Sequence, residues 1–349
     1  MREILDDVGA WLARGERVAV ATVVEVTRSA PRHPGAKMAV SESGQIAGAV
    51  SGGCVEGAVI ELAEEVLRGG SPRLVHFGSD DDPCSIGLPC GGEISVWVQE
   101  FHPGRITELA RTGLRGAEVT LLEGEGAGAK LVVEADGVRS GTLGSAELDR
   151  SAEELAGELL WADRSERRGS LFIDVVAPAP RLIIVGAVDI AAALCTHART
   201  CGWRSYVIDP RARFATAERF PDADEVLAAW PEPALVKLGG IDAATSIVVL
   251  THDPKLDDAA LLLALASPAG FIGAMGSRPA QAERRERLLA AGVDEADLAR
   301  LSAPIGLDLG ATSVSETALS IFAEVVAVRH NRSGGALRNA EGRIHAVSA

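Results

Sequence analysis

Apolar and polar positions alternate with two different periods along the first hundred residues. Apolar side chains recur every three or four positions at 3–15 and 55–67, which predicts two helices. β-branched apolar runs at 18–26 and 37–40 predict strands, because such runs are typical of half-buried sheet. Residues 46–50 lead into the turn before the second helix, and further short strands are expected at 74–77 and 94–98.

The pattern changes twice farther along the chain. From about 101 to 177, short apolar runs between Gly-rich turns predict a β-rich middle region, with a helix at 152–160. After Pro178-Ala179-Pro180, buried apolar strands alternate with turns and helices, which is typical of a parallel sheet. The expected strands are 181–185, 205–208, 246–250 and 271–272, and the expected helices are 191–201, 280–291 and 315–329.

The sequence therefore predicts an α/β fold with an N-terminal mixed α/β domain and a C-terminal Rossmann-like parallel-sheet domain. We expect the first domain to span 1–177, including the β-rich middle region, and the second to span 178–335. The segment after Asn331 is rich in Gly, Ser, Arg and Asn, and residues 336–349 are expected to form a flexible tail.

Composition narrows the choice of partners and location. A net charge of −15 argues against binding to nucleic acid or to an anionic membrane, since both need positive charge. The uncharged run at 259–277 contains Ser267-Pro268-Ala269-Gly270, so we expect no membrane span. Without a signal-like N-terminus, the five cysteines are expected to be reduced in the cytoplasm. The Ala-rich, helix-rich C-terminal half suggests a homodimer.

The first candidate for chemistry is Cys54, which follows Gly52-Gly53 and precedes the helix at 55–67. Glycines allow a sharp turn and a close approach to a ligand, and a helix N-terminus favours thiolate over thiol. Cys90-Gly91-Gly92 has a mirrored setting, so we interpret both turns as one site. The alternative is that Cys54 is a small buried filler.

A zinc site is a further alternative for the same cysteines. Cys54, Cys84, Cys90 and His76 could supply four ligands, but the spacing of six residues between Cys84 and Cys90 is wide for a structural site.

In the second domain, Gly186 and Asp209 stand where a mononucleotide-binding half would have them, 23 residues apart. Val188 occupies a position at which the dinucleotide fingerprint requires glycine. The sequence thus leaves open a Rossmann-like fold that binds no dinucleotide.

Two more loops follow expected strands at the edge where such sheets bind ligands. His252 follows the strand at 246–250; a purely structural histidine is the alternative. The loop that contains Gly273, Gly276, Ser277 and Arg278 precedes a helix, which predicts an anion-binding nest. The alternative is an ordinary Gly-rich turn with a surface arginine.

These segments, from about Val18 to Arg329, resemble the XdhC/CoxI family of accessory proteins for molybdenum hydroxylases. The matching pieces are Ser29-Ala30-Pro31, Gly35-Ala36-Lys37-Met38, Ser51-Gly52-Gly53-Cys54-Val55-Glu56, Cys90-Gly91-Gly92, Asp209-Pro210-Arg211, Arg219-Phe220-Pro221-Asp222-Ala223, Thr251-His252-Asp253, Gly273-Ala274-Met275-Gly276-Ser277-Arg278 and Pro304-Ile305-Gly306-Leu307-Asp308. The family usually has Gly-Ala-Gly-His where this chain has Gly186-Ala187-Val188-Asp189, and Cys84 is extra to its pattern.

The resemblance implies a maturation factor without turnover of its own. Such a protein binds the molybdopterin-type molybdenum cofactor as cargo and helps to load its sulfurated form into a xanthine-dehydrogenase-like hydroxylase. A cysteine desulfurase and cofactor-synthesis proteins are further candidate partners.

We hypothesise that Cys54, with Cys90, faces the molybdenum or carries the sulfur. The other expected cofactor contacts are Ser51, Gly52, Gly53, Lys37, Gly186, Asp209, His252, Gly273, Gly276, Ser277 and Arg278. The alternative function is an NAD(P)-dependent oxidoreductase that uses Asp209 for a ribose and the cysteines as a redox pair.

Overall fold

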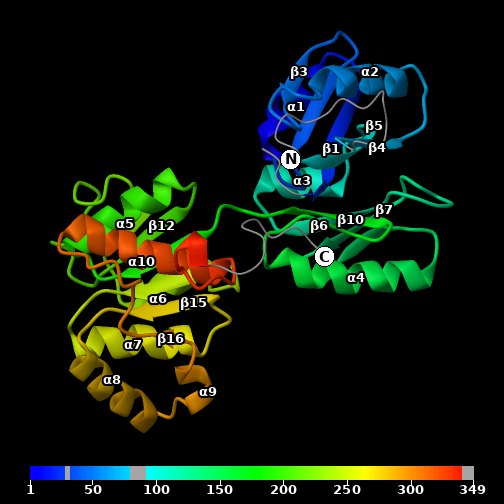
Figure 1. The fold of residues 1–349 in the computed structure, drawn as a ribbon. Coiled ribbons are helices and arrows are strands. Elements are labelled where there is room, and N and C mark those ends of the chain that lie inside the picture. Colours follow the sequence, from blue (N-terminus) through cyan, green and yellow to red (C-terminus); the bar gives the residue numbers. More distant parts are fainter. Residues whose placement is uncertain (28–31, 79–91, 340–349) are drawn as a thin grey trace. The chain divides into compact units, whose positions relative to one another are not determined.

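The computed structural model describes residues 1–27, 32–78 and 92–339. They form two compact units, one from Met1 to Pro178 and one that begins at Ala179 (Figure 1). Each unit has its own sheets and its own apolar cores. No helix within these residue ranges is long and apolar enough to cross a membrane.

The first unit begins with a five-stranded antiparallel sheet in the order β3–β2–β1–β5–β4. Its strands are β1 (Val18–Thr27), β2 (Lys37–Ser41), β3 (Ile46–Gly48), β4 (Arg73–Phe77) and β5 (Glu93–Glu100). The helix α2 (Glu56–Leu67) covers one face of this sheet. The helix α1 (Arg2–Ala13) covers part of the other face through Ile4, Val8 and Trp11.

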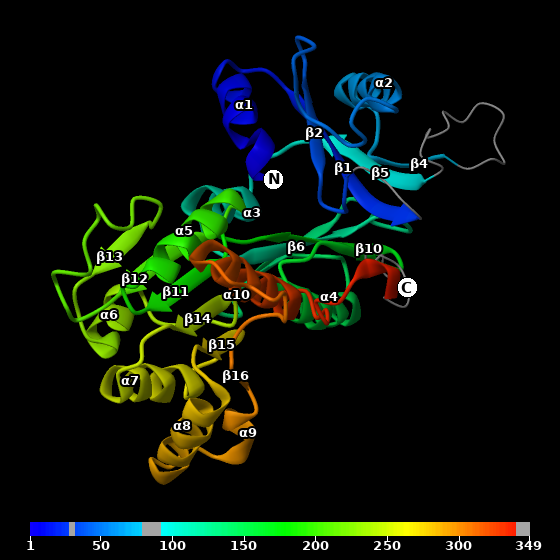
Figure 2. The same cartoon turned by 60° about the vertical axis from the view of Figure 1, so that its left-hand side comes forward.

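A second antiparallel sheet follows in the order β8–β7–β6–β10–β9. Its strands are β6 (Gly116–Leu121), β7 (Lys130–Glu134), β8 (Arg139–Thr142), β9 (Glu166–Arg168) and β10 (Leu171–Val176). The helix α4 (Ala146–Leu160) packs on one face of it. The opposite face meets the first sheet and α3 (Arg105–Thr112), so the second sheet lies between the first sheet and α4 (Figure 2).

The contact between these two sheets is apolar in one part and charged in another. Phe172 of the second sheet packs against Val24 and Trp97 of the first. Elsewhere Lys37 of β2 pairs with Asp174 of β10 at 2.7 Å, and both side chains are almost fully buried. The first unit thus contains a buried ion pair between its sheets.

The second unit is built around a parallel sheet in the order β13–β12–β11–β14–β15–β16. Its strands are β11 (Arg181–Val185), β12 (Arg204–Ile208), β13 (Glu225–Leu227), β14 (Thr245–Val249), β15 (Phe271–Ala274) and β16 (Leu301–Ser302). Its helices are α5 (Asp189–Thr200), α6 (Pro231–Lys237), α7 (Pro254–Leu265), α8 (Arg278–Ala290), α9 (Glu295–Leu298) and α10 (Val314–Arg329), followed by a 3₁₀ turn at Leu337–Asn339.

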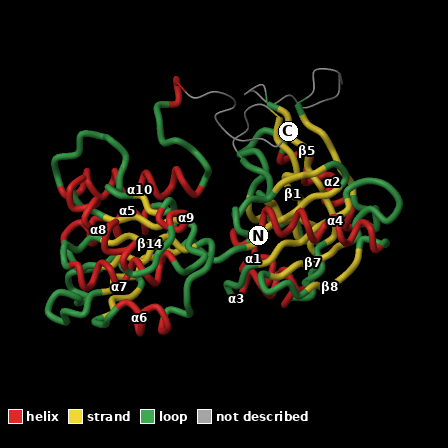
Figure 3. Tube along the Cα trace, turned by 90° about the horizontal axis from the view of Figure 1, so that it is seen from below, coloured by secondary structure: helices red, strands yellow, loops and turns green. Residues whose placement is uncertain are grey.

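Helices cover both faces of this sheet (Figure 3). α5 and α10 pack on one face, and α6, α7 and α8 contribute to the core on the other. Successive residues of β11 point to opposite faces of the sheet. Leu182 and Ile184 enter the core that α5 and α10 cover, and Ile183 and Val185 enter the core that α6, α7 and α8 cover. Burial on both sides explains why this strand is an uninterrupted apolar run.

The predicted fold class is confirmed, with antiparallel sheets first and a parallel Rossmann-like sheet second. The helix predicted at 152–160 begins earlier, at Ala146, because the Ser145 hydroxyl caps it by accepting a hydrogen bond from the Leu148 amide. Of the tail predicted at 336–349, residues 340–349 lie outside the described ranges.

Candidate functional site

The Cys54 turn, residues 51–56, connects β3 to α2 in the first unit. Gly52 and Gly53 have φ angles of +85° and +122°, a left-handed backbone that residues with side chains rarely adopt. The buried Ser51 hydroxyl accepts a hydrogen bond from the Cys54 amide at 3.0 Å. These features fold the chain sharply just before the helix begins.

Glu56, the first residue of α2, folds its side chain back into this turn. Its carboxylate accepts hydrogen bonds from the amides of Ser51, Gly52 and Gly53, each at 2.8 Å, and from the Ser51 hydroxyl at 2.6 Å. Burial raises the pKa of Glu56, but the bonds from Ser51 and the amides outweigh it and set the pKa at about 2. An internal carboxylate therefore occupies the amides that the sequence suggested for a ligand.

Cys54 is a free cysteine with a half-buried side chain at the edge of the core beneath α2. We expected the N-terminus of this helix to act on the thiol. In the structure the Glu56 carboxylate compensates that positive end. The predicted partner, Cys90, lies outside the described residues, as does Cys84, so the shared site and the zinc alternative stay predictions. Within the described ranges, no three His, Cys, Asp or Glu side chains form a metal-binding group.

Lys37, also predicted to contact the cofactor, points away from the face that α2 covers. Its ammonium pairs with Asp174 and lies 3.3 Å from the Thr22 hydroxyl. Met38, its neighbour in β2, points the other way, into the core beneath α2. The structure thus gives Lys37 a role in joining the two sheets of the first unit.

In the second unit, the predicted residues follow the carboxyl ends of the central strands, where doubly wound folds bind ligands. Gly186 has a φ of +117°, and a Cβ there would lie only 2.6 Å from the Thr251 methyl carbon. Glycine therefore allows the turn after β11 to pack on the segment after β14. His252 follows in that segment, and its side chain is exposed.

Asp209, at the end of β12, is fully buried and already has four hydrogen-bond donors. Its oxygens accept from the Ala187 amide at 2.8 Å, and from the Arg211 amide and guanidinium at 2.6–2.9 Å. Burial raises the pKa of Asp209, but Arg211 and the Ala187 amide lower it below its ordinary value. A ribose would have to displace Arg211 to reach this carboxylate.

The start of α5 carries a negative side chain where a dinucleotide fold places its pyrophosphate. Asp189 is the first residue of the helix, it is well exposed, and the Arg219 guanidinium lies 3.2 Å from it. Val188 packs against the core that lies under α5. Together, Asp189 and the occupied carboxylate of Asp209 disfavour a dinucleotide at this edge.

The predicted anion loop, 273–278, leads from β15 into α8. Gly273 lies inside β15, where a Cβ would come within 2.3 Å of Ile305, so its lack of a side chain serves packing. Gly276 has a φ of +143°, and the Ser277 hydroxyl caps α8. Arg278 is exposed at the start of that helix, a setting that favours an anion.

Two buried charged residues under these loops were not predicted from the sequence. Arg284 of α8 donates to Asp257 of α7 at 2.7 Å and to the Met275 carbonyl at 3.2 Å. Asp257 also accepts from the Thr251 hydroxyl. This pair connects the segment before His252 with the anion loop. The one available signal was that Arg284 lies a single helical turn before an apolar residue, Leu288.

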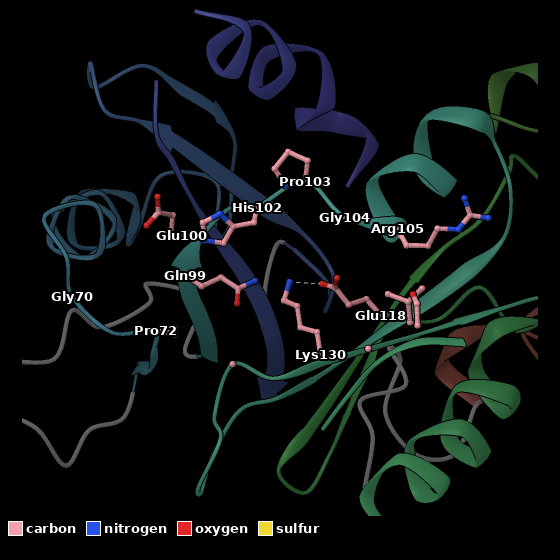
Figure 4. A pocket seen from close by; sticks show the side chains of 14 residues that line it. Gly70, Pro72, Gln99, Glu100, His102, Pro103, Gly104, Arg105, Glu118 and Lys130 are labelled. Carbon is pink, nitrogen blue, oxygen red and sulfur yellow. Dashed lines mark hydrogen bonds and ion pairs between the residues drawn. The ribbon is translucent and has the colours of Figure 1, made fainter. Parts of the chain in front are cut away.

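The first unit also contains a cavity of about 530 Å³ that no sequence pattern indicated (Figure 4). Gln99, His102, Glu118 and Lys130 lie on its wall. Among the described residues that line it, none was predicted to bind a ligand.

Two segments of the chain match known families. Residues 11–78 match the XdhC and CoxI family, and residues 182–325 match the XdhC Rossmann domain. The first match includes the Cys54 turn, and the second includes the loops after β11, β12, β14 and β15.

Similar proteins span most of the chain. A probable xanthine dehydrogenase subunit from Bacillus subtilis is 28% identical, covering 92% of this chain and 96% of its own length. The molybdenum cofactor insertion chaperone PaoD from Escherichia coli is 26% identical and covers 91% and 85%. The crystal structure of a xanthine dehydrogenase from Bacillus halodurans is 26% identical, covers 97% and 98%, and has a TM-score of 0.66.

Proposed function

Because this chain belongs to the XdhC and CoxI family, we propose that it binds the molybdenum cofactor as cargo and delivers it to a molybdenum hydroxylase. The named chaperone among its relatives supports this proposal, since it aligns with 91% of the chain. The proposed recipient is an enzyme of the xanthine dehydrogenase type, and a cysteine desulfurase is the proposed source of the cofactor's sulfur. The protein itself acts as a carrier rather than an enzyme.

The proposal rests mainly on the position of Cys54. The cofactor has a soft molybdenum–dithiolene centre, and a cysteine thiolate is the soft ligand that proteins offer. Cys54 is partly exposed on a turn whose amides are already fixed by Glu56. The thiol is therefore the group that this turn presents to the molybdenum centre, while Ser51, Gly52 and Gly53 shape its backbone.

The second unit offers a separate contact for an anionic group, such as the phosphate of the cofactor. Arg278 is exposed at the start of α8, and its planar fork of donors suits a phosphate. Gly276 gives the loop its left-handed backbone, and Ser277 caps the helix behind it. His252 follows the neighbouring strand, and we propose it as a further polar contact.

An NAD(P)-dependent oxidoreductase is the second candidate, and the strand order of the second unit is the observation in its favour. The polar groups at the edge of that sheet argue against an NAD(P) site. Arg211 and the Ala187 amide occupy the Asp209 carboxylate, and Asp189 places negative charge at the start of α5. We therefore propose cargo binding over hydride transfer.

Cofactor retention by cysteine variants tests the proposal. Cys54→Ala is compared with Cys201→Ala, which removes an exposed free cysteine of the second unit. We expect Cys54→Ala to co-purify with about tenfold less sulfurated cofactor and to activate the target hydroxylase correspondingly less. Cys201→Ala should behave like the wild type. Equal retention and equal activation by both variants would contradict the role of Cys54.

A further inference from the structure

Two aromatic side chains of this protein are exposed to water, and both belong to the second unit. The sequence contains five Trp, seven Phe and one Tyr, and all of them lie within the described ranges. Phe214 is 46% exposed and Trp230 is 49% exposed, whereas the other aromatic residues are buried or half-buried. Single exposed apolar side chains are ordinary on a protein surface, so their position relative to each other decides whether they have a use.

Both residues follow strands that end at the same edge of the parallel sheet. β12 and β13 are neighbours and run in the same direction (Figure 2). Phe214 lies in the loop that follows β12, and Trp230 lies three residues after the end of β13. Pro233 and Val236 follow Trp230 at a spacing of three residues, and both are exposed on α6. Exposed apolar groups thus gather at this edge rather than being scattered.

The loop around Phe214 fixes the position of its ring. The guanidinium of Arg211 lies 4.7 Å from the centre of the ring, and that of Arg219 lies 5.5 Å from it. Arg219 also donates to the carbonyls of Phe214 and Ala187, each at 3.1 Å, and the next residue, Ala215, is buried in the core under α5. An exposed ring that is already ordered loses little conformational freedom on binding, which favours its use as a contact.

The same loop is basic, although the chain as a whole is acidic. Residues 210–219 contain three arginines and one acid, whereas the net charge of the chain is −15. Arg211 and Arg219 each pair with an aspartate. Arg213, next to Phe214, is exposed and forms no ion pair with another described residue. Because two acidic proteins repel each other, a local unpaired cation is a place where an acidic partner can bind.

A protein is the class of partner that fits this combination of groups. Trp, Phe and Arg are enriched at the centres of protein–protein interfaces, where one ring or guanidinium often supplies much of the affinity. Nucleic acid and anionic membranes are disfavoured by the net charge of −15. A small anion would use the Arg213 guanidinium but would leave the rings of Phe214 and Trp230 in water.

We propose that Arg213, Phe214 and Trp230 form a docking surface for an acidic surface of the recipient hydroxylase. A carboxylate of the partner pairs with Arg213, and apolar side chains beside it cover the two rings. The identity of the partner rests on the proposed function, whereas the docking surface itself does not. The loops after β14 and β15, which contain His252 and Arg278, lie farther along the same edge. The partner therefore docks beside the proposed cargo contacts.

Binding of the full-length protein to the hydroxylase of the same organism tests the inference. Both proteins are purified without cofactor, and biolayer interferometry measures the dissociation constant. We expect Phe214→Ala, Trp230→Ala and Arg213→Glu each to raise it about tenfold or more. Arg213→Lys should stay within about threefold of the wild type, because it keeps the charge. Raising the NaCl concentration should weaken the wild type more than Arg213→Glu, since salt screens exposed charges.

Two variants of the first unit control for loss of an exposed apolar side chain and for reversal of an exposed charge. Leu114→Ala matches Phe214→Ala, and Arg150→Glu matches Arg213→Glu. Both controls should bind the hydroxylase like the wild type. Thermal unfolding of each variant shows whether it is folded.

Further measurements separate this inference from the cargo proposal and from a second copy as the occupant. Arg213→Glu and Phe214→Ala should retain as much cofactor as the wild type. Docking is measured without cofactor, so loss of the cargo proposal leaves this result unchanged. Sedimentation of the isolated protein should show the same oligomeric state for the wild type and Arg213→Glu. The inference is overturned if Arg213→Glu dissociates a wild-type dimer, if the wild type does not bind the hydroxylase at high micromolar concentration, or if folded Arg213→Glu and Phe214→Ala bind as tightly as their controls.

Discussion

The carboxylate of Glu56 accepts two hydrogen bonds from Ser51, one from the backbone amide at 2.8 Å and one from the hydroxyl at 2.6 Å. With the amides of Gly52 and Gly53, these bonds make the Cys54 turn a nest whose anion belongs to the chain itself. The turn therefore needs no bound ligand to satisfy these amides, and Glu56 fixes the backbone that carries the thiol.

Removing the charge of Glu56 should loosen this turn. We expect Glu56→Gln to lower the free energy of unfolding by about 1–3 kcal/mol, because the amides lose a charged acceptor. We also expect faster alkylation of Cys54 by iodoacetamide at pH 7, since the helix N-terminus is then no longer compensated by a neighbouring carboxylate.

Glu61→Gln is the matched control, because Glu61 lies exposed on the same helix. Its unfolding free energy and alkylation rate should equal those of the wild type. An alkylation rate for Glu56→Gln that does not exceed the rate for Glu61→Gln would contradict the proposed electrostatic balance at Cys54.

The same carboxylate should make stability depend on pH. The pKa of Glu56 is about 2 in the folded chain, below its ordinary value of 4.5, so the unfolded chain binds more protons between these values. The stabilisation by Glu56 is complete above about pH 4.5 and declines as the pH falls toward 2. Urea unfolding of the wild type and Glu56→Gln should thus show a difference that shrinks between pH 5 and pH 3. A difference that stays constant over that interval would count against this pKa.

The buried Asp257–Arg284 pair should be far more important for stability than its exposed neighbour. Asp257→Ala leaves Arg284 buried without its partner, and we expect a loss of about 3–5 kcal/mol in the free energy of unfolding. Asp258→Ala breaks the more exposed pair with Arg287, and a loss of about 1 kcal/mol or less is expected. Urea unfolding of both variants measures the contrast. Similar losses would mean that the pair does not support the loops after β14 and β15.

Nicotinamide nucleotides should not bind tightly to the second unit. The Asp209 carboxylate is occupied by Arg211, and Asp189 would repel a pyrophosphate at the start of α5. Calorimetric titration of the apo-protein with NAD(H) and NADP(H) should show no low-micromolar binding. A dissociation constant in that range for either nucleotide would restore the oxidoreductase alternative.

The sequence predicted those helices and strands whose buried residues form a clear local pattern of apolar positions. The β11 segment was recognisable because a strand covered on both faces is apolar throughout. The helix α3 was not, because it is polar overall and only residues such as Ile106 and Leu109 contact the core. The start of α4 was placed late because its first turns are charged and its capping residue, Ser145, lies outside the apolar pattern.

The sequence indicated the backbone turns of the candidate site, but not which groups its charged side chains contact. Glycines at 52, 53 and 186 indicated sharp turns, because glycine permits the positive φ angles that these turns adopt. By contrast, the partner of Lys37 is Asp174, far away in the chain, and only the folded sheets bring them together. Similarly, the sequence shows Glu56 two residues after Cys54, but not that its side chain turns back to fill the nest.

Mass spectrometry of the ligand released from the wild-type protein tests the central proposal most directly. The protein is to be purified without oxygen from cells supplied with molybdate. We predict that the released ligand contains molybdopterin, with molybdenum and the cofactor's sulfur, and that it is depleted in Cys54→Ala but not in Cys201→Ala. Protein that repeatedly yields no pterin under these conditions, although the host makes active molybdenum hydroxylase, would contradict the proposal.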